Sequence, residues 1–158
     1  MSRVDDKYLG IDPGKKGAMS IVDSDGAYVE SMRLCEPLQV VQAWLREHAP
    51  SIKFAMLERV WAKGGEGAVG AFSFGVSFGA CEALLAAFEI PHELVLPLKW
   101  QRSMGVPKPP KKATKTQKKN AIKQVALRLW PKAKITLIEC DAMLIAEYCR
   151  RTRLGIGG

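Results

Sequence analysis

The chain has 158 residues, enough for one domain with a sizeable core, and 47% of them are apolar. Its formal net charge of +8 favours a polyanionic partner. No apolar run approaches about 18 residues, and the N-terminus lacks the apolar segment of a signal peptide. We therefore expect a single domain over residues 1–158, with no membrane partner and a cytoplasmic location. The four scattered cysteines indicate reduced thiols rather than a zinc site or disulfides.

Three strands are predicted first, over residues 7–12, 17–22 and 27–33, and an Asp-Gly turn before the third favours an antiparallel meander. The first strand ends at Asp12, directly before Pro13-Gly14. An aspartate there can simply cap a backbone N–H of the turn. Alternatively, Asp12 anchors a metal site, which requires that other carboxylates reach the same place.

A helix over 37–48 leads to a strand over 53–58, and this strand also ends in an acid, Glu58. A helix between two strands is the usual crossover of a parallel pair, whose ends lie on the same side. Asp12 and Glu58 would then meet at one edge of the sheet. A fifth strand is predicted over 92–96, parallel to the fourth, and a helical turn from Pro97 follows it.

A helix over 67–88 carries small residues four apart, at Gly67, Ala71, Gly75 and Gly79. Each helical glycine costs up to about 1 kcal/mol relative to alanine, which indicates close approach of another element. That element is either the chain's own sheet or a second subunit. The preceding glycine-rich run lacks the Gly-Lys-Ser/Thr ending of a phosphate-binding loop and is predicted to be an ordinary loop.

The segment between Glu93 and Glu139 contains no acidic residue and 12 of the 24 basic residues. A block of one sign beside an acidic centre is typical of a phosphate-binding surface. Its proline-rich first part, about 104–114, is predicted to be a mobile basic loop. A helix over about 114–130 follows, with Ile122, Val125, Ala126 and Leu129 facing inward.

The last predicted helix begins near residue 140 and carries Asp141 in its first turn. One interpretation is an acid that complements the helix dipole. The other follows from the apolar residues Leu144, Ile145 and Tyr148, which would bury this helix against the sheet and hold Asp141 close to it.

Three motifs taken together resemble the RuvC family of Holliday junction resolvases, within the ribonuclease H-like superfamily. They are the strand ending in Asp12-Pro13-Gly14, the run Met56-Leu57-Glu58, and the helix that starts Asp141-Ala-Met-Leu-Ile-Ala-Glu-Tyr. The match spans residues 8 to about 152, and the glycines and phenylalanines of residues 70–79 are most similar to phage-type and organellar-type members. The resemblance implies an α/β, ribonuclease H-like fold with a mixed five-stranded sheet flanked by helices. It also implies a homodimer that nicks two symmetry-related strands of a four-way DNA junction, in the host cytoplasm if the protein is phage-encoded.

The resemblance also implies a metal site with two Mg²⁺ per subunit, for which Mn²⁺ can substitute. Its ligands would be Asp12, Glu58 and Asp141. The family's further acidic position corresponds to Ile138, which cannot bind a metal, so Glu139 is the remaining candidate for a fourth ligand. Carboxylates without histidine or cysteine suit hard divalent ions better than zinc. A lysine of the basic helix, near Lys115, Lys118 or Lys119 and taken as Lys119, would stabilise the charge that develops on the phosphate.

The same resemblance and the basic block indicate a set of DNA-contacting residues. Trp61 falls where the family tends to place an aromatic residue at the junction centre, and the cations expected around it are Lys63, Lys99, Arg102, Lys108, Lys111, Lys112, Lys115, Lys118 and Lys119. Because phosphate contacts carry no base information, no cleavage-sequence preference is predicted.

Three other functions fit parts of the pattern. An Asp-x-Gly after a first strand also opens the actin-like kinase fold, but that fold needs two domains and more than 158 residues. A ribonuclease H-like nuclease acting on other branched nucleic acids, and a non-catalytic branched-DNA-binding protein lacking one metal ligand, both stay open.

Overall fold

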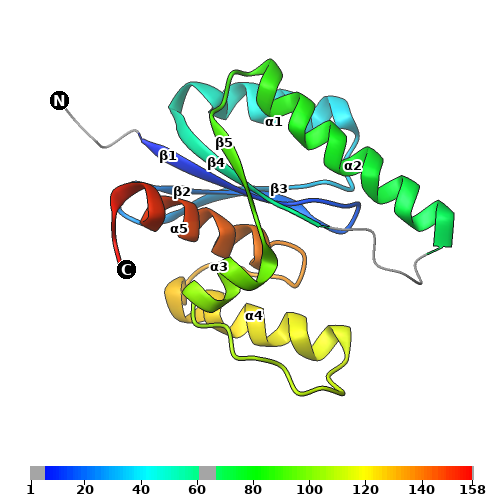
Figure 1. The fold of residues 1–158 in the computed structure, drawn as a ribbon. Helices are drawn as coiled ribbons and strands as arrows, with labels where there is room; N and C mark the ends of the chain where they lie inside the picture. The colour runs from blue at the N-terminus through cyan, green and yellow to red at the C-terminus, as the bar shows by residue number, and fades with distance from the viewer. Residues whose placement is uncertain (1–5, 61–66, 158) are drawn as a thin grey trace.

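The computed structural model describes residues 6–60 and 67–157, which form a five-stranded mixed sheet with helices on both faces (Figure 1). The strand order is β3-β2-β1-β4-β5. An antiparallel meander consists of β1 (Lys7–Asp12), β2 (Ala18–Asp23) and β3 (Tyr28–Arg33). On the other side of β1, β4 (Ile52–Glu58) and β5 (His92–Val95) pair in parallel. The predicted sheet is confirmed, with every strand boundary within one residue of its prediction.

Two layers of helices cover this sheet (Figure 1). One face carries α1 (Leu38–His48), followed by the short 3₁₀ turn η2 (Ala49–Ser51), and α2 (Gly67–Ala87). The opposite face carries α3 (Pro97–Ser103), α4 (Lys115–Leu129) and α5 (Cys140–Leu154). In Figure 1, α5 lies between the sheet and the pair formed by α3 and α4.

Alternation along β1 separates two hydrophobic cores. Leu9 and Ile11 pack with α1 and α2, whereas Tyr8 packs with α4 and α5. Because successive side chains of a strand point to opposite faces, Asp12 shares the face of Tyr8, toward α5. The same period places Glu58 with Phe54 and Met56, which pack in the α5 core. Both strand-terminal acids therefore face α5.

α5 lies unusually close to the sheet, because Gly10 in the middle of β1 has no side chain. A Cβ atom at this position would come well within 3.0 Å of the backbone of Ala142 and Ala146. Every residue from Cys140 to Arg150 is buried. This close packing sets the position of the first turn of α5, which contains Asp141.

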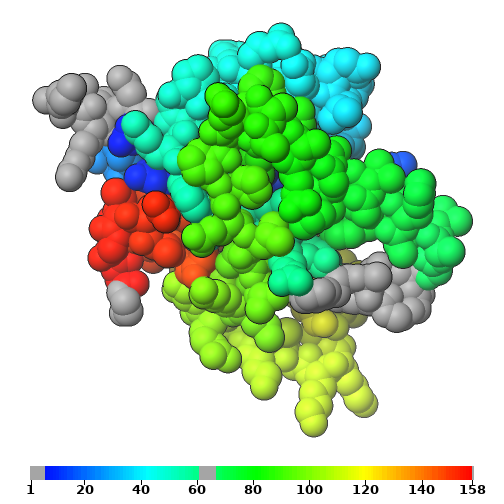
Figure 2. Space-filling model, turned by 45° about the horizontal axis from the view of Figure 1, so that its top comes forward, coloured from blue at the N-terminus to red at the C-terminus, as the bar shows by residue number. Residues whose placement is uncertain are grey.

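α2 exposes much of its apolar surface. Phe72 is 75% and Val69 85% exposed, and an added Cβ at Gly75 or Gly79 would meet no atom within 4 Å. The glycines therefore do not serve packing against the chain's own sheet. Figure 2 shows α2 in green along the surface and projecting at one side.

α2 also corrects one sequence-based expectation. The helix is 21 residues long and contains an 18-residue stretch that is long and apolar enough to cross a membrane; 11% of that stretch is buried. The prediction that no apolar segment approaches the length of a membrane span is therefore wrong for this helix. Length and composition alone do not distinguish a membrane-crossing helix from one whose apolar face is covered by another protein chain.

The basic segment consists of irregular chain and a helix. Residues 104–114 form turns and extended chain between α3 and α4, as predicted, and their mobility stays a prediction. Thr114 begins α4 with a capping box: its side chain accepts a hydrogen bond from the N–H of Gln117, whose side chain accepts one from Thr114. Ile122, Val125 and Ala126 face inward as predicted, but Leu129 is 36% exposed because it lies in the last turn.

We predict that Gly10→Ala lowers the free energy of unfolding by about 2 kcal/mol or more, because the added methyl group must displace the backbone of α5. Urea unfolding followed by circular dichroism measures the change. Gly79→Ala is the matched control, since its methyl group meets no neighbour and should change stability by no more than about 1 kcal/mol. Equal stability of Gly10→Ala and the wild type would contradict the close packing.

Candidate metal centre

The structure brings together the three carboxylates that the sequence indicates. Asp12 and Glu58 end the neighbouring parallel strands β1 and β4, and Asp141 lies in the first turn of α5. Glu58 and Asp141 are 7% and 6% exposed, and the side chain of Asp12 is 13% exposed. Three acids from distant parts of the chain thus share one largely buried site.

Lys119 of α4 reaches into this cluster. Its Nζ lies 2.8 Å from Oδ1 of Asp141 and 3.4 Å from Oδ2 of Asp12. Burial disfavours the charged ammonium group, but the two carboxylates outweigh this effect and raise the pKa of Lys119. Lys119 therefore stays protonated and partly neutralises the acids.

Burial and mutual repulsion raise the pKa of two of the acids. Burial, then the charge of Asp141, raises the pKa of Asp12 to about 7 against the pull of Lys119. For Glu58, burial followed by the charge of Asp12 raises the pKa to about 8. Strongly shifted carboxyl groups at one edge of a sheet are typical of functional sites.

Trp100 of α3 adds a hydrogen bond that the sequence analysis missed. Its Nε1 donates to Oε2 of Glu58 at 2.6 Å, and its side chain is completely buried. A signal for it exists in the sequence: Trp100 follows β5, whose end lies at the same edge of the sheet as Glu58. Sequence reasoning used this short helix only for its cations.

Glu139 does not join the cluster. One carboxylate oxygen accepts a hydrogen bond from Nε of Arg33 on β3 at 2.7 Å, and the other accepts one from the hydroxyl of Thr136. These two partners lower the pKa of Glu139 although burial opposes this. The assignment of Glu139 as a fourth ligand is therefore not supported, because its carboxylate is committed to β3 and to the loop before α5.

A shallow cleft of about 370 Å³ opens beside Asp12, lined by the turn after β1, the start of α2 and Lys119. Lys15 and Lys16, in the turn directly after Asp12, also line it and are exposed. Sequence reasoning missed these two lysines, although their place next to Asp12 was a usable signal. The cleft gives an anionic ligand access to the acids between basic side chains.

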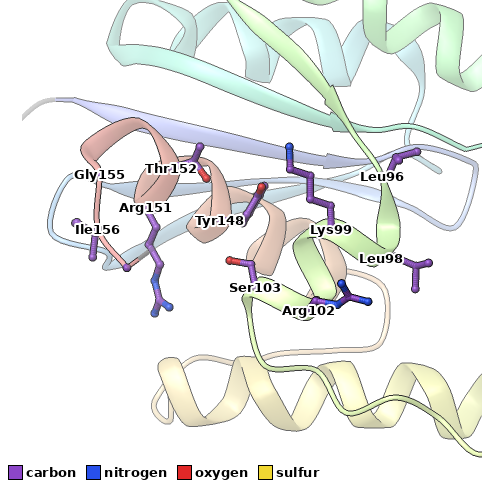
Figure 3. Close-up of a pocket in the computed structure, with 11 residues that line it drawn as sticks. Leu96, Leu98, Lys99, Arg102, Ser103, Tyr148, Arg151, Thr152, Gly155 and Ile156 are labelled. Carbon is purple, nitrogen blue, oxygen red and sulfur yellow. The ribbon is translucent and has the colours of Figure 1, made fainter.

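Most of the predicted DNA-contacting cations lie at the surface of the protein. Seven of them are exposed and form no ion pair with any described residue: Lys99, Arg102, Lys108, Lys111, Lys112, Lys115 and Lys118. Lys99 and Arg102 line a groove of about 740 Å³ between α3 and the end of α5, where Figure 3 also shows Arg151. Trp61 and Lys63 lie outside the described residues.

The donor set fits hard divalent cations. Its oxygen atoms come from carboxylates held close enough to raise the pKa of Asp12 and Glu58, and a cation would relieve that repulsion. Lys119 lies between two of the acids. In this arrangement, no three His, Cys, Asp or Glu side chains within residues 6–60 and 67–157 are placed to hold a single ion. Asp12, Glu58 and Asp141 are nevertheless the residues that would hold one.

No family model and no curated protein matches the chain. Solved structures do match. Thermus thermophilus RuvC in complex with a Holliday junction substrate has a TM-score of 0.62 and 17% identity, and the match covers 96% of this chain and 98% of that one. A second T. thermophilus RuvC structure has a TM-score of 0.58 and 18% identity with the same coverage. The chain therefore has the RuvC-like, ribonuclease H-like fold; the phage or organellar type stays a prediction.

The raised pKa values predict how stability depends on pH without metal. Asp12 and Glu58 have ordinary pKa values of 3.8 and 4.5, against about 7 and about 8 in the folded protein. At pH values between the ordinary and the raised pKa of each acid, the folded state binds more protons than the unfolded state. The free energy of unfolding therefore falls as pH rises. We expect Asp12→Asn to weaken this dependence, because the amide does not ionise.

Urea unfolding in EDTA at pH 5 and pH 8 measures the effect for the wild type and the variant. An equal loss of stability in both proteins would contradict the repulsion inferred for Asp12.

Proposed function

We propose that the protein is a metal-dependent endonuclease that resolves four-way DNA junctions by paired, symmetric nicks. The observation that carries the proposal is the largely buried cluster of Asp12, Glu58 and Asp141, set in a RuvC-like fold, with the exposed Lys15 and Lys16 lining the cleft beside Asp12. The matched RuvC structure in complex with a Holliday junction substrate supports the choice of branched DNA.

In this proposal Asp12, Glu58 and Asp141 hold two Mg²⁺ per subunit, and Mn²⁺ can replace them. Divalent cations bound there would supply an activated water and charge stabilisation at the leaving oxygen. The chain's own residues would do the rest. Lys15, Lys16 and the cations of α3, α4 and the segment between them would bind the phosphates, and Lys119 would turn from the carboxylates toward the scissile phosphate.

Two alternatives follow from specific observations. The same centre would serve a nuclease that acts on three-way or flap DNA, because phosphate contacts do not define the branch geometry. A non-catalytic branched-DNA-binding protein is favoured by Glu139, whose carboxylate is held by Arg33 and Thr136, so that three acids among the described residues serve the centre. Cleavage assays with four-way, three-way and flap substrates separate these functions.

We propose further that two copies associate through α2, as paired nicking of a twofold junction requires. The described part of this helix contains a single charged residue, Glu82, and its apolar face is exposed at Val69, Phe72 and Val76. An apolar groove of about 460 Å³ between α1 and α2 adjoins that face. The open glycines allow a partner helix to approach closely.

Asp12→Asn should abolish Mg²⁺-dependent nicking of a four-way junction and leave junction binding intact, because the amide is a poor ligand but the DNA-contacting cations are unchanged. Gel-based cleavage in Mg²⁺ and binding in EDTA measure the two properties. Asp6→Asn is the control, since Asp6 pairs with Lys53 at the surface, 3.3 Å apart. Cleavage that survives in Asp12→Asn, or is absent in the wild type, would overturn the nuclease proposal.

Phe72→Glu should convert a wild-type dimer into a monomer, because it places a charge in the apolar face of α2. Sedimentation velocity measures the mass. Leu98→Glu on α3 is the control, because Leu98 is 76% and Phe72 75% exposed. A monomeric wild type, or an unchanged dimer in Phe72→Glu, would contradict the interface. So would wild-type flotation with phosphatidylcholine vesicles that Phe72→Glu abolishes, since α2 would then contact lipid.

A further inference from the structure

Trp100 combines complete burial with a polar group directed at the candidate metal centre. It lies in α3, immediately after β5, and its ring is part of the core formed with α4 and α5. Lys99 and Arg102 of the same helix line the groove in Figure 3. α3 thus carries cations at the surface and a single indole N–H inside.

That N–H has one partner, Oε2 of Glu58, at 2.6 Å. A buried hydrogen bond from an uncharged donor to a carboxylate is short and comparatively strong. Within the described chain, Trp100 is the only side chain that forms a hydrogen bond or ion pair with the Glu58 carboxylate. Without it, a carboxylate that is 7% exposed would lose its one protein donor.

Lys119 does not take over this role. Its ammonium group is within ion-pair distance of Asp12 and Asp141, but Glu58 forms no such pair among the described residues. Two different side chains therefore hold the acids: Lys119 pairs with Asp12 and Asp141, and the indole of Trp100 donates to Glu58.

We infer that Trp100 is a positioning residue for metal binding, whose N–H fixes one oxygen of Glu58 and leaves the other for a divalent cation. The inference rests on the proposed function, because it assigns Glu58 as a ligand. Partners that hold ligating carboxylates typically contribute 10- to 100-fold to metal affinity. A phenylalanine would fill most of the same space, so the need for tryptophan lies in its donor.

The chain offers a matched control in Trp44 of α1. Its Nε1 also donates to a glutamate oxygen at 2.6 Å, here Oε2 of Glu30 on β3. Trp44 is 8% exposed and packs in the core on the opposite face of the sheet. Trp44→Phe therefore removes the same kind of bond at a distance from the centre.

The test is isothermal titration of DNA-free protein with Mn²⁺, for wild type, Trp100→Phe and Trp44→Phe. We expect Trp100→Phe to bind Mn²⁺ about 10- to 100-fold more weakly, and Trp44→Phe to bind as the wild type does. In junction cleavage, Trp100→Phe should need correspondingly more Mg²⁺ for half-maximal rate, while junction binding in EDTA is unchanged.

Wild-type affinity in Trp100→Phe, or equal losses in both variants, would overturn the positioning role while leaving the proposed nuclease intact. A wild type that neither binds Mn²⁺ nor cuts junctions would instead overturn the proposed function, and with it this inference. If Trp100→Phe does not fold, β-(3-benzothienyl)alanine at position 100 keeps the ring shape and removes only the donor. The same loss of Mn²⁺ affinity is then expected, and its absence would overturn the role.

Discussion

The close contact between α5 and β1 is the constraint on which the rest of the site depends. Since Gly10 has no side chain, the backbone of α5 at Ala142 and Ala146 lies directly against the strand. The first turn of α5 then brings Asp141 beside Asp12, which ends the same strand. A larger residue at position 10 would separate the two acids, so a missing side chain in the core defines the geometry of a polar site at its edge.

The positive charge that the chain supplies at the acidic centre does not balance the negative charge of its carboxylates. Burial and repulsion raise the pKa of Asp12 and Glu58, and a single cation, Lys119, lies among three carboxylates. Such a cluster is costly unless further positive charge arrives. Divalent cations would provide it from solution, and the exposed cations of α3 and α4 would attract the phosphates that the acids repel. The same imbalance thus favours both metal and nucleic-acid binding.

Much of the fold and part of the centre could be predicted from local patterns. Short apolar runs identified β1 and β4, and each ends in an acid at the same edge of the sheet. Lys119 was harder to identify, because Lys118 and Lys119 lie four and three residues before the buried Ile122, and the helical pattern alone does not distinguish them. Proximity in sequence misled for Glu139, which lies two residues from Asp141 yet bonds to Arg33 of β3.

The sequence by itself determined the order of helices and strands, the acids at the ends of two parallel strands and the one-signed basic segment, because these depend on periodicity, turn residues and charge within a few positions. Only the tertiary structure decided that Lys119 bridges Asp12 and Asp141, that Trp100 holds Glu58 and that Glu139 pairs elsewhere. The residues in these pairs lie 22 to 107 positions apart in the sequence. Their formation depends on how helices pack on the sheet, which no local pattern encodes.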